Sequence, residues 1–483
     1  MRPDLQLTAS PDPDTAGAAG AATDTPPETQ NAPPSDTALA TLTSKLAAAP
    51  LDATLHDAVA NALRAAGNES GALAHRVAVD TFRMLEGMGR NSPEIALYNL
   101  ATVYYLKGDY ASALRWFEHT LAIAPGLAIA HQNLAAVLDL LGRAADAEKH
   151  RRRAYELQRI YVEPAKGAPR RVLILCSGRP SGNVPFDTLL PPQTSYRIKY
   201  AIDCAEEAED ASLPPFDLVF NAIGEPDIAA PLTPRLEAFE RSCGSVMLNR
   251  PSAVAATQRH GLPALLAGLD DALTAPCIRL DDVPASGKAL ASQLVEGGIN
   301  FPLLMRPLST HGGSGVVRHA SVDTLWPALE AHRAPCYLTT FRDYRSTDGH
   351  YRKYRVVFVD GQAFPYHLAI SSHWMVHYFS AEMTSAPWKL EEERRFLEDV
   401  GATLGERGLR AVEAIGRRLA LDYGGIDFTL LPDGRVLVFE ANATMLVHRE
   451  KAGGALAHKN AFVQRIFDAF EQLQASRMGR RGQ

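Results

Sequence analysis

The stretch GGIDFTLLPDGRVLVFEANATM, residues 424–445, is the part of the sequence that best predicts both the fold and the site. Two runs rich in β-branched and aromatic residues, 428–431 and 436–439, lie on either side of Pro432-Asp433-Gly434. β-Branched and aromatic residues favour strands, and Pro, Asp and Gly favour tight turns. The stretch therefore predicts two antiparallel strands joined by a turn.

Polar residues stand at the ends of both predicted strands. Asp427 precedes the first run, while Glu440 and Asn442 end the second and share one face because strand side chains alternate. A two-residue loop at Asp433-Gly434 would put Asp427 opposite Glu440, whereas an odd loop with a bulge would separate them. An even loop would thus bring together three oxygen ligands of the kind that Mg²⁺ prefers. The alternative is an ordinary hairpin whose charges face water.

The chain has 483 residues, 46% of them apolar and 22% charged, with a net charge of −6. This length predicts about three domains. The negative net charge argues against a protein that binds nucleic acid or a membrane surface. The sequence has no apolar run of membrane-spanning length and no signal-like apolar core near its start, so a cytoplasmic location is expected. The scattered cysteines form no CxxC pair, which predicts buried thiols.

Both ends of the chain are predicted to be disordered. Residues 1–37 are rich in Pro and Ala and hold few large apolar side chains, so they cannot bury enough surface to offset the entropy of ordering. The short basic end, residues 476–483, is interpreted in the same way. No function is predicted for either tail.

Residues 38–161 have the Ala/Leu-rich periodicity of helices and contain an internal repeat. Aligning Glu94 with Ala128 gives two units in which small, aromatic and turn residues fall at the positions typical of tetratricopeptide (TPR) repeats. Gly108 and Gly142 would form the turn within each unit. The segment resembles a TPR domain.

Residues 52–90 resemble an earlier helical pair with poor consensus, as expected of a capping unit. The resemblance implies that the repeats dock a protein or peptide partner. The alternatives are a rigid scaffold and a dimerisation surface, so a homodimer stays open.

Continuous apolar runs after residue 170 are typical of strands buried on both faces. They begin at Arg171, Phe216 and Ser245 with helical stretches between them, so residues 170–250 predict a small doubly wound α/β domain. Residues 162–171 have the composition of a linker.

A glycine-rich loop follows a predicted strand that ends at Arg306-Pro307. Glycines and small hydroxyl residues let backbone N–H groups approach phosphates closely, and Arg306 would add positive charge at the same place. The alternative is an ordinary hairpin with a glycine-rich turn. The loop residues predicted to bind phosphate are Ser309, Thr310, Gly312, Gly313, Ser314 and Gly315.

A second predicted hairpin, residues 350–368, carries Lys353 and Arg355 one strand period apart, so both would point at one anion. The alternative for either residue is a basic strand face in solvent. Beyond this hairpin, His373 and His377 are four apart and would share a helix face. Because HWMVH lacks the glutamate of HExxH, a substrate-contacting loop is expected there in preference to a zinc site. The alternative is that these residues pack in the interior with their ring nitrogens hydrogen-bonded.

The order of these parts resembles the ATP-grasp superfamily over about residues 170–475. With the repeats, the resemblance implies a multidomain protein: all-α TPR-like repeats, an α/β pre-ATP-grasp domain at 170–250, and an α+β ATP-grasp domain at 251–475. The nucleotide would lie between the two subdomains of the ATP-grasp domain.

The resemblance also implies roles for individual residues. Arg306 would meet the α/β phosphates of ATP, although the superfamily usually has lysine there, and Arg355 would face the transferring phosphoryl group beside Lys353. Arg259 is the candidate for a second basic residue that is usually lysine. The cation, Mg²⁺ or Mn²⁺, would be held by Asp427, Glu440 and Asn442.

For activity, the resemblance implies that ATP phosphorylates a carboxylate and that an amine attacks the acyl phosphate, while Mg²⁺ and arginines neutralise the spreading charge. The carboxylate and the amine would be small molecules or peptides, with no role for nucleic acid or a membrane. The absence of a recognisable nucleophile motif agrees with this chemistry. Two alternatives stay open: a phosphotransferase with the same fold, and a nucleotide-binding TPR adaptor without catalysis.

Overall fold

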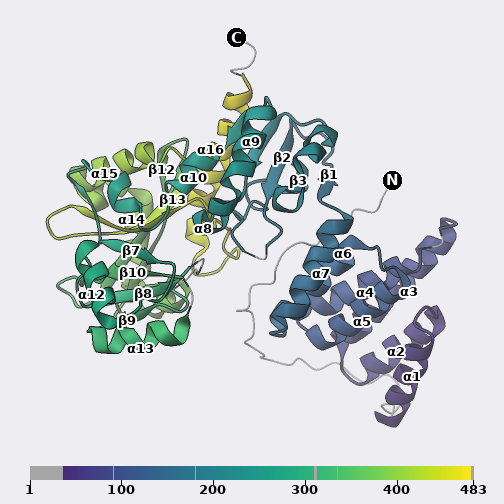
Figure 1. Cartoon of the computed structure of the whole chain (residues 1–483). Coiled ribbons are helices and arrows are strands. Elements are labelled where there is room, and N and C mark those ends of the chain that lie inside the picture. Colours follow the sequence, from purple (N-terminus) through teal and green to yellow (C-terminus); the bar gives the residue numbers. More distant parts are fainter. Residues whose placement is uncertain are drawn as a thin grey trace. The chain divides into compact units, whose positions relative to one another are not determined.

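The computed structural model describes residues 36–90, 92–179, 181–308, 310, 313–333 and 335–479. The predicted amino-terminal tail, except for its last two residues, lies outside the described residues, and so do residues 480–483 of the predicted carboxyl-terminal tail. The chain divides into two compact units, with the boundary between Gln158 and Arg159. The first unit is helical, and the second contains three β-sheets (Figure 1).

The first unit consists of helical hairpins with the predicted repeat. α4 and α6 begin at Glu94 and Ala128, the two residues whose alignment defines the repeat. Each hairpin turns at a glycine in the left-handed region, Gly108 at φ 79° and Gly142 at φ 75°, where other residues would be strained. The helices are α1 (Asp36–Ala48), α2 (Ala53–Ala65), α3 (Glu69–Gly87), α4 (Glu94–Leu106), α5 (Tyr110–Ile123), α6 (Ala128–Leu140) and α7 (Ala144–Leu157).

Two histidine pairs, the first of them buried, repeat within this unit. The Nδ1 atoms of His56 and His75 lie 2.8 Å apart, and those of His131 and His150 lie 2.9 Å apart. In each pair, Nε2 of the first histidine donates to the carbonyl of the proline six residues earlier, so its Nδ1 accepts a hydrogen bond from Nδ1–H of its partner. Burial, followed by the nearby charges of His56 and Arg115, lowers the pKa of His75 to about 3.

We expect this burial to make the first unit sensitive to acid. His75 binds a proton near pH 6.5 when unfolded but only near pH 3 when folded, so the stability it contributes is complete above pH 6.5 and is lost as the pH falls toward 3. His75→Gln should therefore reduce the fall in unfolding free energy between pH 6.5 and pH 4 by about 2–3 kcal/mol. Urea unfolding followed by circular dichroism measures this difference. His119→Gln is the control, and an unchanged pH dependence in His75→Gln would contradict the expectation.

The second unit begins with a five-stranded sheet in the order β1-β3-β2-β4-β5. β2 to β5 are parallel and β1 is an antiparallel edge. The three predicted apolar runs are strands β2, β4 and β5, whereas β3 was missed because arginine and lysine interrupt its apolar residues. The prediction of a linker over residues 162–171 is wrong for its first two residues, because Val162 and Glu163 belong to a strand and pair with β3.

The strands of this α/β sheet are β1 (Ile160–Glu163), β2 (Arg171–Cys176), β3 (Tyr196–Ala201), β4 (Leu218–Asn221) and β5 (Met247–Leu248). Its α-helices and those that follow it are α8 (Pro226–Ala229), α9 (Thr233–Ser242), α10 (Pro251–Ala255) and α11 (Leu262–Leu265). Short 3₁₀ turns are η1 (Ile202–Cys204), η2 (Glu207–Ser212) and η3 (Ala230–Leu232).

A smaller, four-stranded sheet follows in the order β7-β10-β8-β9, with every neighbouring pair antiparallel. α12 and α13 pack against it through a core that includes Leu290, Leu303, Leu325 and Leu338. Its elements are β7 (Cys277–Leu280), α12 (Gly287–Glu296), β8 (Leu303–Pro307), β9 (Val317–His319), α13 (Val322–His332) and β10 (Cys336–Thr340).

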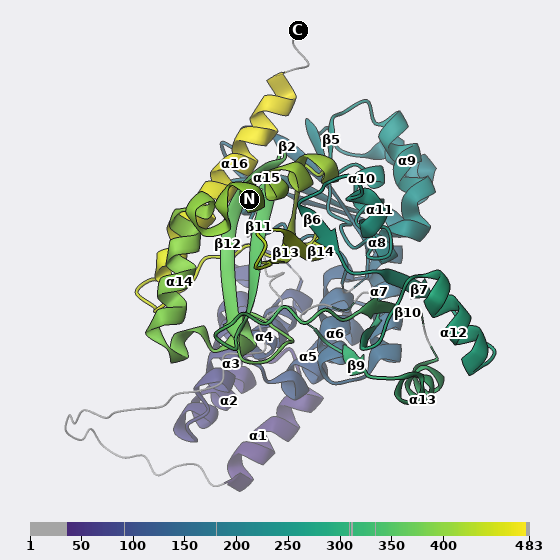
Figure 2. The ribbon, with the colours of Figure 1, turned by 90° about the vertical axis from the view of Figure 1, so that its left-hand side faces the viewer.

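The larger sheet has the order β12-β11-β13-β14-β6 and is antiparallel except for β6, which runs parallel to β14. α14 and α15 cover one face, where a Cβ on Gly416 of α15 would lie 2.7 Å from the ring of Phe358. On the other face α16 contacts β11 and β12, and Phe470 packs on Tyr423 and on Phe220 of the α/β sheet. Figure 2 shows the long β11–β12 hairpin with α14 beside it.

The strands of the larger sheet are β6 (Ala272–Thr274), β11 (Tyr351–Val359), β12 (Gln362–Ser371), β13 (Tyr423–Leu430) and β14 (Val436–Asn442). Its helices and turns are η4 (Phe379–Ala381), η5 (Met383–Ser385), α14 (Pro387–Glu398), α15 (Val400–Leu419), η6 (Ala457–Lys459) and α16 (Asn460–Gly479). Because α16 continues to Gly479, the prediction of a disordered tail at 476–483 is wrong for residues 476–479.

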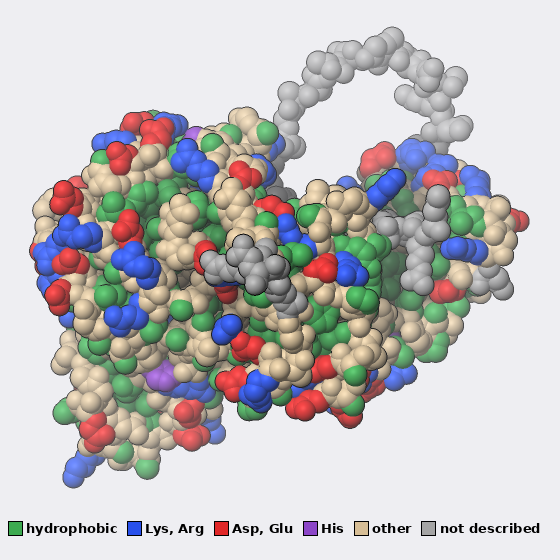
Figure 3. Space-filling model, turned by 90° about the horizontal axis from the view of Figure 1, so that it is seen from above, with side chains coloured by type: hydrophobic (Ala, Val, Ile, Leu, Met, Phe, Trp, Pro, Cys, Tyr) green, Lys and Arg blue, Asp and Glu red, His purple; other side chains and the backbone are tan. Residues whose placement is uncertain are grey.

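The predicted fold class is confirmed. Helical repeats are followed by an α/β sheet and then by two mainly antiparallel sheets with helices of the α+β kind. Within the described part of the chain, no helix is both long and apolar enough to cross a bilayer. On the face shown in Figure 3, acidic and basic side chains are interspersed among apolar ones.

Candidate functional site

The turn between β13 and β14 differs from the prediction. Leu430 pairs with Val436, which leaves an odd loop at residues 431–435, with Gly434 in the left-handed region at φ 81°. The prediction that the site requires an even loop is therefore wrong.

A β-bulge further along the same hairpin compensates for the odd loop. The register shifts between Asp427 and Phe428, where β14 contains one extra residue, Phe439. Because the bulge restores the register that the loop changes, Asp427 still lies opposite Glu440, as the sequence predicts.

Asp427 and Glu440 belong to a row of four side chains that crosses the larger sheet. On β12, His367 pairs with Arg355 of β11. Arg355 in turn pairs with Asp427, and Asp427 with Glu440. Residues directly opposite each other share a face of a sheet, so the register alone brings an arginine and two carboxylates together.

Asp427 is held by two basic side chains of β11. Arg355 donates to both carboxylate oxygens, from Nε at 2.6 Å and from a terminal nitrogen at 2.8 Å, and the Lys353 ammonium lies 3.1 Å away. The side chain of Asp427 is only 1% exposed. Burial alone would raise its pKa, but the charges of Arg355 and Lys353 outweigh burial and hold the pKa well below its usual range. Lys353 and Arg355 do point at one anion, which is the chain's own Asp427, and their binding of a phosphate stays a prediction.

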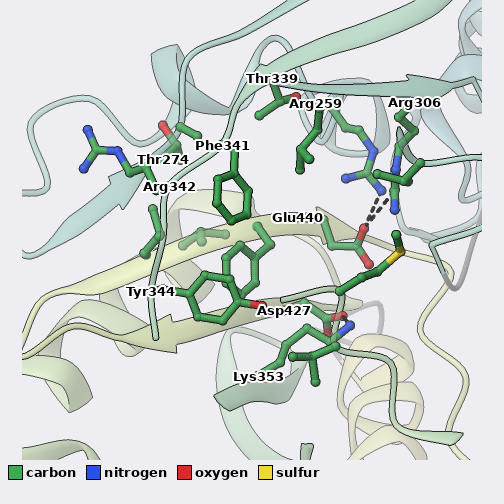
Figure 4. Close-up of a pocket in the computed structure, with 18 of the residues that line it drawn as sticks. Arg259, Thr274, Arg306, Thr339, Phe341, Arg342, Tyr344, Lys353, Asp427 and Glu440 are labelled. Atoms are coloured by element: carbon green, nitrogen blue, oxygen red, sulfur yellow. Dashed lines mark hydrogen bonds and ion pairs between the residues drawn. The ribbon is translucent and has the colours of Figure 1, made fainter. Parts of the chain in front are cut away.

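Glu440 is held by arginines that come from outside the larger sheet. Arg259, between α10 and α11, and Arg306, on β8, both approach its Oε2 atom, Arg306 at 3.4 Å (Figure 4). Burial opposes ionisation of Glu440, but these charges lower its pKa to about 2. Burial and the charge of Arg259 lower the pKa of Arg306 to about 10. Glu440 therefore joins the larger sheet to the smaller one across a cleft.

The cleft holds about 1250 Å³ of space, part of which is open solvent. Its lining includes two acidic side chains, Asp427 and Glu440, and five basic ones: Arg259, Arg306, Arg342, Lys353 and Arg355. The excess of positive charge predicts an anionic ligand.

The two ends of the cleft differ in character. Figure 4 shows Arg259, Arg306, Glu440, Asp427 and Lys353 toward one end, and Thr274, Phe341, Arg342 and Tyr344 toward the other. At the second end the rings of Tyr344 and Phe439 lie 4.8 Å apart. One ligand with a charged part and a flat apolar part would match this arrangement.

The predicted glycine loop is only partly described. Gly313 lines the cleft at φ 83°, and a Cβ there would lie 2.8 Å from Met375 Sδ. The Thr310 hydroxyl donates to the Pro307 carbonyl at 3.0 Å. Gly315, at φ 70°, leaves no room for a Cβ beside Pro307, 2.9 Å away. Two further predicted phosphate ligands, Ser309 and Gly312, lie outside the described residues.

Of the predicted site residues, most of those described line the cleft. They are Arg259, Arg306, Gly313, Lys353, Arg355, Asp427 and Glu440. Thr310, Ser314, Gly315 and Asn442 are not part of the lining. Asn442 follows Glu440 at the strand period, and its Oδ1 accepts from the Thr444 hydroxyl at 3.2 Å.

The donor set suits a hard divalent cation. Asp427 and Glu440 face each other, and Asn442 adds an amide oxygen at the end of the same strand. The described chain, the cleft included, contains no group of three or more His, Cys, Asp or Glu side chains arranged to hold a metal, so the cleft offers two carboxylates and one amide only. The helix face expected for His373 and His377 is wrong, because residues 372–378 form a loop.

The residues missed by the sequence analysis belong mainly to loops. Trp374, Met375, Val376 and His377 line the cleft from the loop after β12, which the sequence predicts to contact substrate, although none of the four was named as a site residue. Phe341, Arg342 and Tyr344 line it from the connection between β10 and β11.

Comparison with known proteins gives one family match. Residues 92–160 match the tetratricopeptide repeat family. This match covers the two helical hairpins formed by α4 to α7. No curated protein matches the chain.

Several solved structures are similar in fold. They include D-alanine–D-alanine ligase from Bacillus anthracis complexed with ATP, at 14% identity over 64% of this chain and 97% of that one, with a TM-score of 0.40. A RimK domain ATP-grasp protein from Sphaerobacter thermophilus is 15% identical over 61% of this chain and 98% of that one, with a TM-score of 0.36. Carboxyaminoimidazole ribonucleotide synthase from Aspergillus clavatus, complexed with ATP, is 16% identical over 62% and 77%, with a TM-score of 0.39.

The tight packing of β13 leads to a prediction about the row of side chains that contains Asp427. A Cβ on Gly425 would lie 2.5 Å from the Val356 carbonyl oxygen and 2.9 Å from Met445 Cγ. We expect Gly425→Ala to displace the strand that carries Asp427 and to lower the free energy of unfolding by about 1–3 kcal/mol. Urea denaturation measures this change. Gly287→Ala, where an added Cβ meets no atom within 4 Å, is the control; equal effects of the two substitutions would refute the packing argument.

Proposed function

We propose that the chain is an ATP- and Mg²⁺-dependent ligase that activates a carboxylate as an acyl phosphate and joins it to an amine. The observation that carries the proposal is the pair of facing carboxylates, Asp427 and Glu440, in a cleft rich in basic side chains. An anion-binding cleft with hard oxygen donors inside it is what a metal-bound polyphosphate requires.

The proposed pose follows from the two ends of the cleft. The phosphates would lie at the charged end, where Arg259 and Arg306 offer guanidinium donors. The base would lie between the sheets at the end that contains Tyr344 and Phe439. Backbone N–H groups of the loop that contains Gly313 would approach the phosphates from the smaller sheet.

The proposed chemistry uses charge stabilisation and positioning. A carboxylate oxygen of the substrate attacks the γ-phosphorus and ADP leaves; the amine nitrogen then attacks the acyl carbon and phosphate leaves. Arg355 and Lys353 would stabilise the charge that spreads over the transferring group. When bound, Mg²⁺ or Mn²⁺ supplies further neutralisation of phosphate charge, and Asp427, Glu440 and Asn442 would hold it. No side-chain nucleophile is needed.

The repeats extend this proposal to a partner. Residues 92–160 match the tetratricopeptide family, and we propose that the first unit docks a protein or a peptide substrate for the ligase. The alternative is that the repeats form the interface of a homodimer. Affinity capture with the full chain and with residues 36–158 deleted would distinguish them, because only the first use predicts loss of a heterologous partner.

A hydroxylamine-trapping assay tests the reaction. With ATP, Mg²⁺ and a panel of amino acids and peptides, a ligase forms a hydroxamate and ADP, a phosphotransferase forms ADP without hydroxamate, and an adaptor binds nucleotide without turnover. We expect hydroxamate with at least one carboxylate.

Substitution of the cation ligands should remove the activity selectively. We expect Glu440→Gln and Asp427→Asn each to lower turnover by about 10²-fold or more, the scale at which single charge-stabilising groups act. Glu392→Gln is the matched control, because Glu392 binds Arg352 on the α14 side of the sheet, away from the cleft. Undiminished turnover in either cleft variant would contradict the cation assignment.

A further inference from the structure

Two arginines of the cleft, Arg259 and Arg306, already bind an anion, which is the chain's own Glu440. Arg259 and Arg306 approach the same atom, Glu440 Oε2, from two different parts of the second unit. We propose that Glu440 is an internal competitor for phosphate: a polyphosphate must displace it from these arginines, and only the displaced carboxylate is free to hold a divalent cation. This inference rests on the proposed function of the cleft.

The balance of charge favours such an exchange. Two guanidinium groups share a single carboxylate, and an arginine side chain stays protonated in proteins, so the excess positive charge persists. A polyphosphate brings several negative charges and accepts bidentate hydrogen bonds from each guanidinium. It is therefore a better partner for this pair than one carboxylate is.

The two carboxylates differ in how easily they can be released. Asp427 is 1% exposed and is held by three contacts of 3.1 Å or less, from Arg355 and Lys353, which lie on the neighbouring strand. Glu440 is 20% exposed; it contacts Arg259 closely and Arg306 at a longer distance, 3.4 Å. Removing one partner of a fully buried pair is costly, and the cost is smaller for a side chain that is partly exposed at a cleft wall. Glu440 is therefore the exchangeable carboxylate, and Asp427 is the fixed one.

The position of Glu440 makes the exchange a coupling between two sites. While Glu440 Oε2 accepts hydrogen bonds from the two arginines, Glu440 has fewer lone pairs and less net charge to offer a cation. Phosphate binding removes this competition, so each ligand raises the affinity for the other by the same factor. The contact also links β14 to β8 across the cleft, so its release would loosen the join between the two sheets.

The alternative is that the contact only supports the structure. In that case Glu440→Gln would leave the arginines with less support and would not improve their binding to an anion. The two accounts thus predict opposite changes in the affinity of the variant for phosphate when no metal is present.

The test uses the full chain and inorganic tripolyphosphate in EDTA, measured by titration calorimetry. We expect Glu440→Gln to bind tripolyphosphate at least about tenfold more tightly than the wild type, because the competing charge is gone. Glu392→Gln should bind as the wild type does. Equal or weaker binding by Glu440→Gln would overturn the proposal.

A second measurement needs no substitution and therefore stands if Glu440→Gln fails to fold. Binding of Mn²⁺ to the wild type, followed by electron paramagnetic resonance, should be at least about tenfold tighter with tripolyphosphate bound to the chain than without it, after correction for Mn²⁺ complexed by free tripolyphosphate. Equal affinity in the two conditions would overturn the proposal. If the wild type turns over Mg²⁺-ATP but fails both tests, only the competition is refuted; if it binds neither Mg²⁺-ATP nor tripolyphosphate, the proposed function itself fails.

Discussion

The buried ion pair between Asp427 and Arg355 is the interaction on which the rest of the site depends. A carboxylate that is 1% exposed is stable only with a closely placed partner, and Arg355 supplies two hydrogen bonds from the directly opposite position on β11. Lys353 adds a second cation because it lies one strand period away. This local neutralisation lets one face of an otherwise apolar sheet carry charged side chains into the interior.

The cleft results from joining this charged face to a second sheet. Glu440 extends the row by one strand, and Arg306 of the smaller sheet reaches it from across the cleft. The basic side chains outnumber the acidic ones in the lining, so the interior stays electropositive even with its own ion pairs formed. A polyphosphate with a bound cation would complete this balance, which is the physical basis of both the proposed activity and the proposed competition by Glu440.

Much of this arrangement could be predicted from short-range patterns. Strand periodicity correctly placed Lys353 and Arg355 on one anion, and the repeat alignment found the starts of α4 and α6. The opposition of Asp427 and Glu440 was also predicted, but through an even loop that does not exist; an odd loop and the bulge at Phe439 offset each other. Register depends on the sum of such irregularities, and composition does not reveal a bulge.

The parts that could not be predicted depend on contacts between distant segments. β1 is a strand only because β3 lies beside it, and β3 itself has polar residues within its apolar run. The contact of Arg259 with Glu440 joins residues far apart in the sequence, so no spacing rule could establish it. The loop after β12 lines the cleft through Trp374 and Met375, although the local sequence predicts a helix face for its histidines.

The central claim, that a nucleotide binds between the two sheets of the second unit, is tested most directly by hydrogen–deuterium exchange of the full chain with and without Mg²⁺ and a non-hydrolysable ATP analogue. The account predicts that protection on binding concentrates in residues 303–308, 313–316, 337–344 and 437–442, where β8, β10 and β14 and the segments next to them border the cleft. Protection confined to residues 36–158, or no change at the cleft under conditions where the analogue binds, would contradict it.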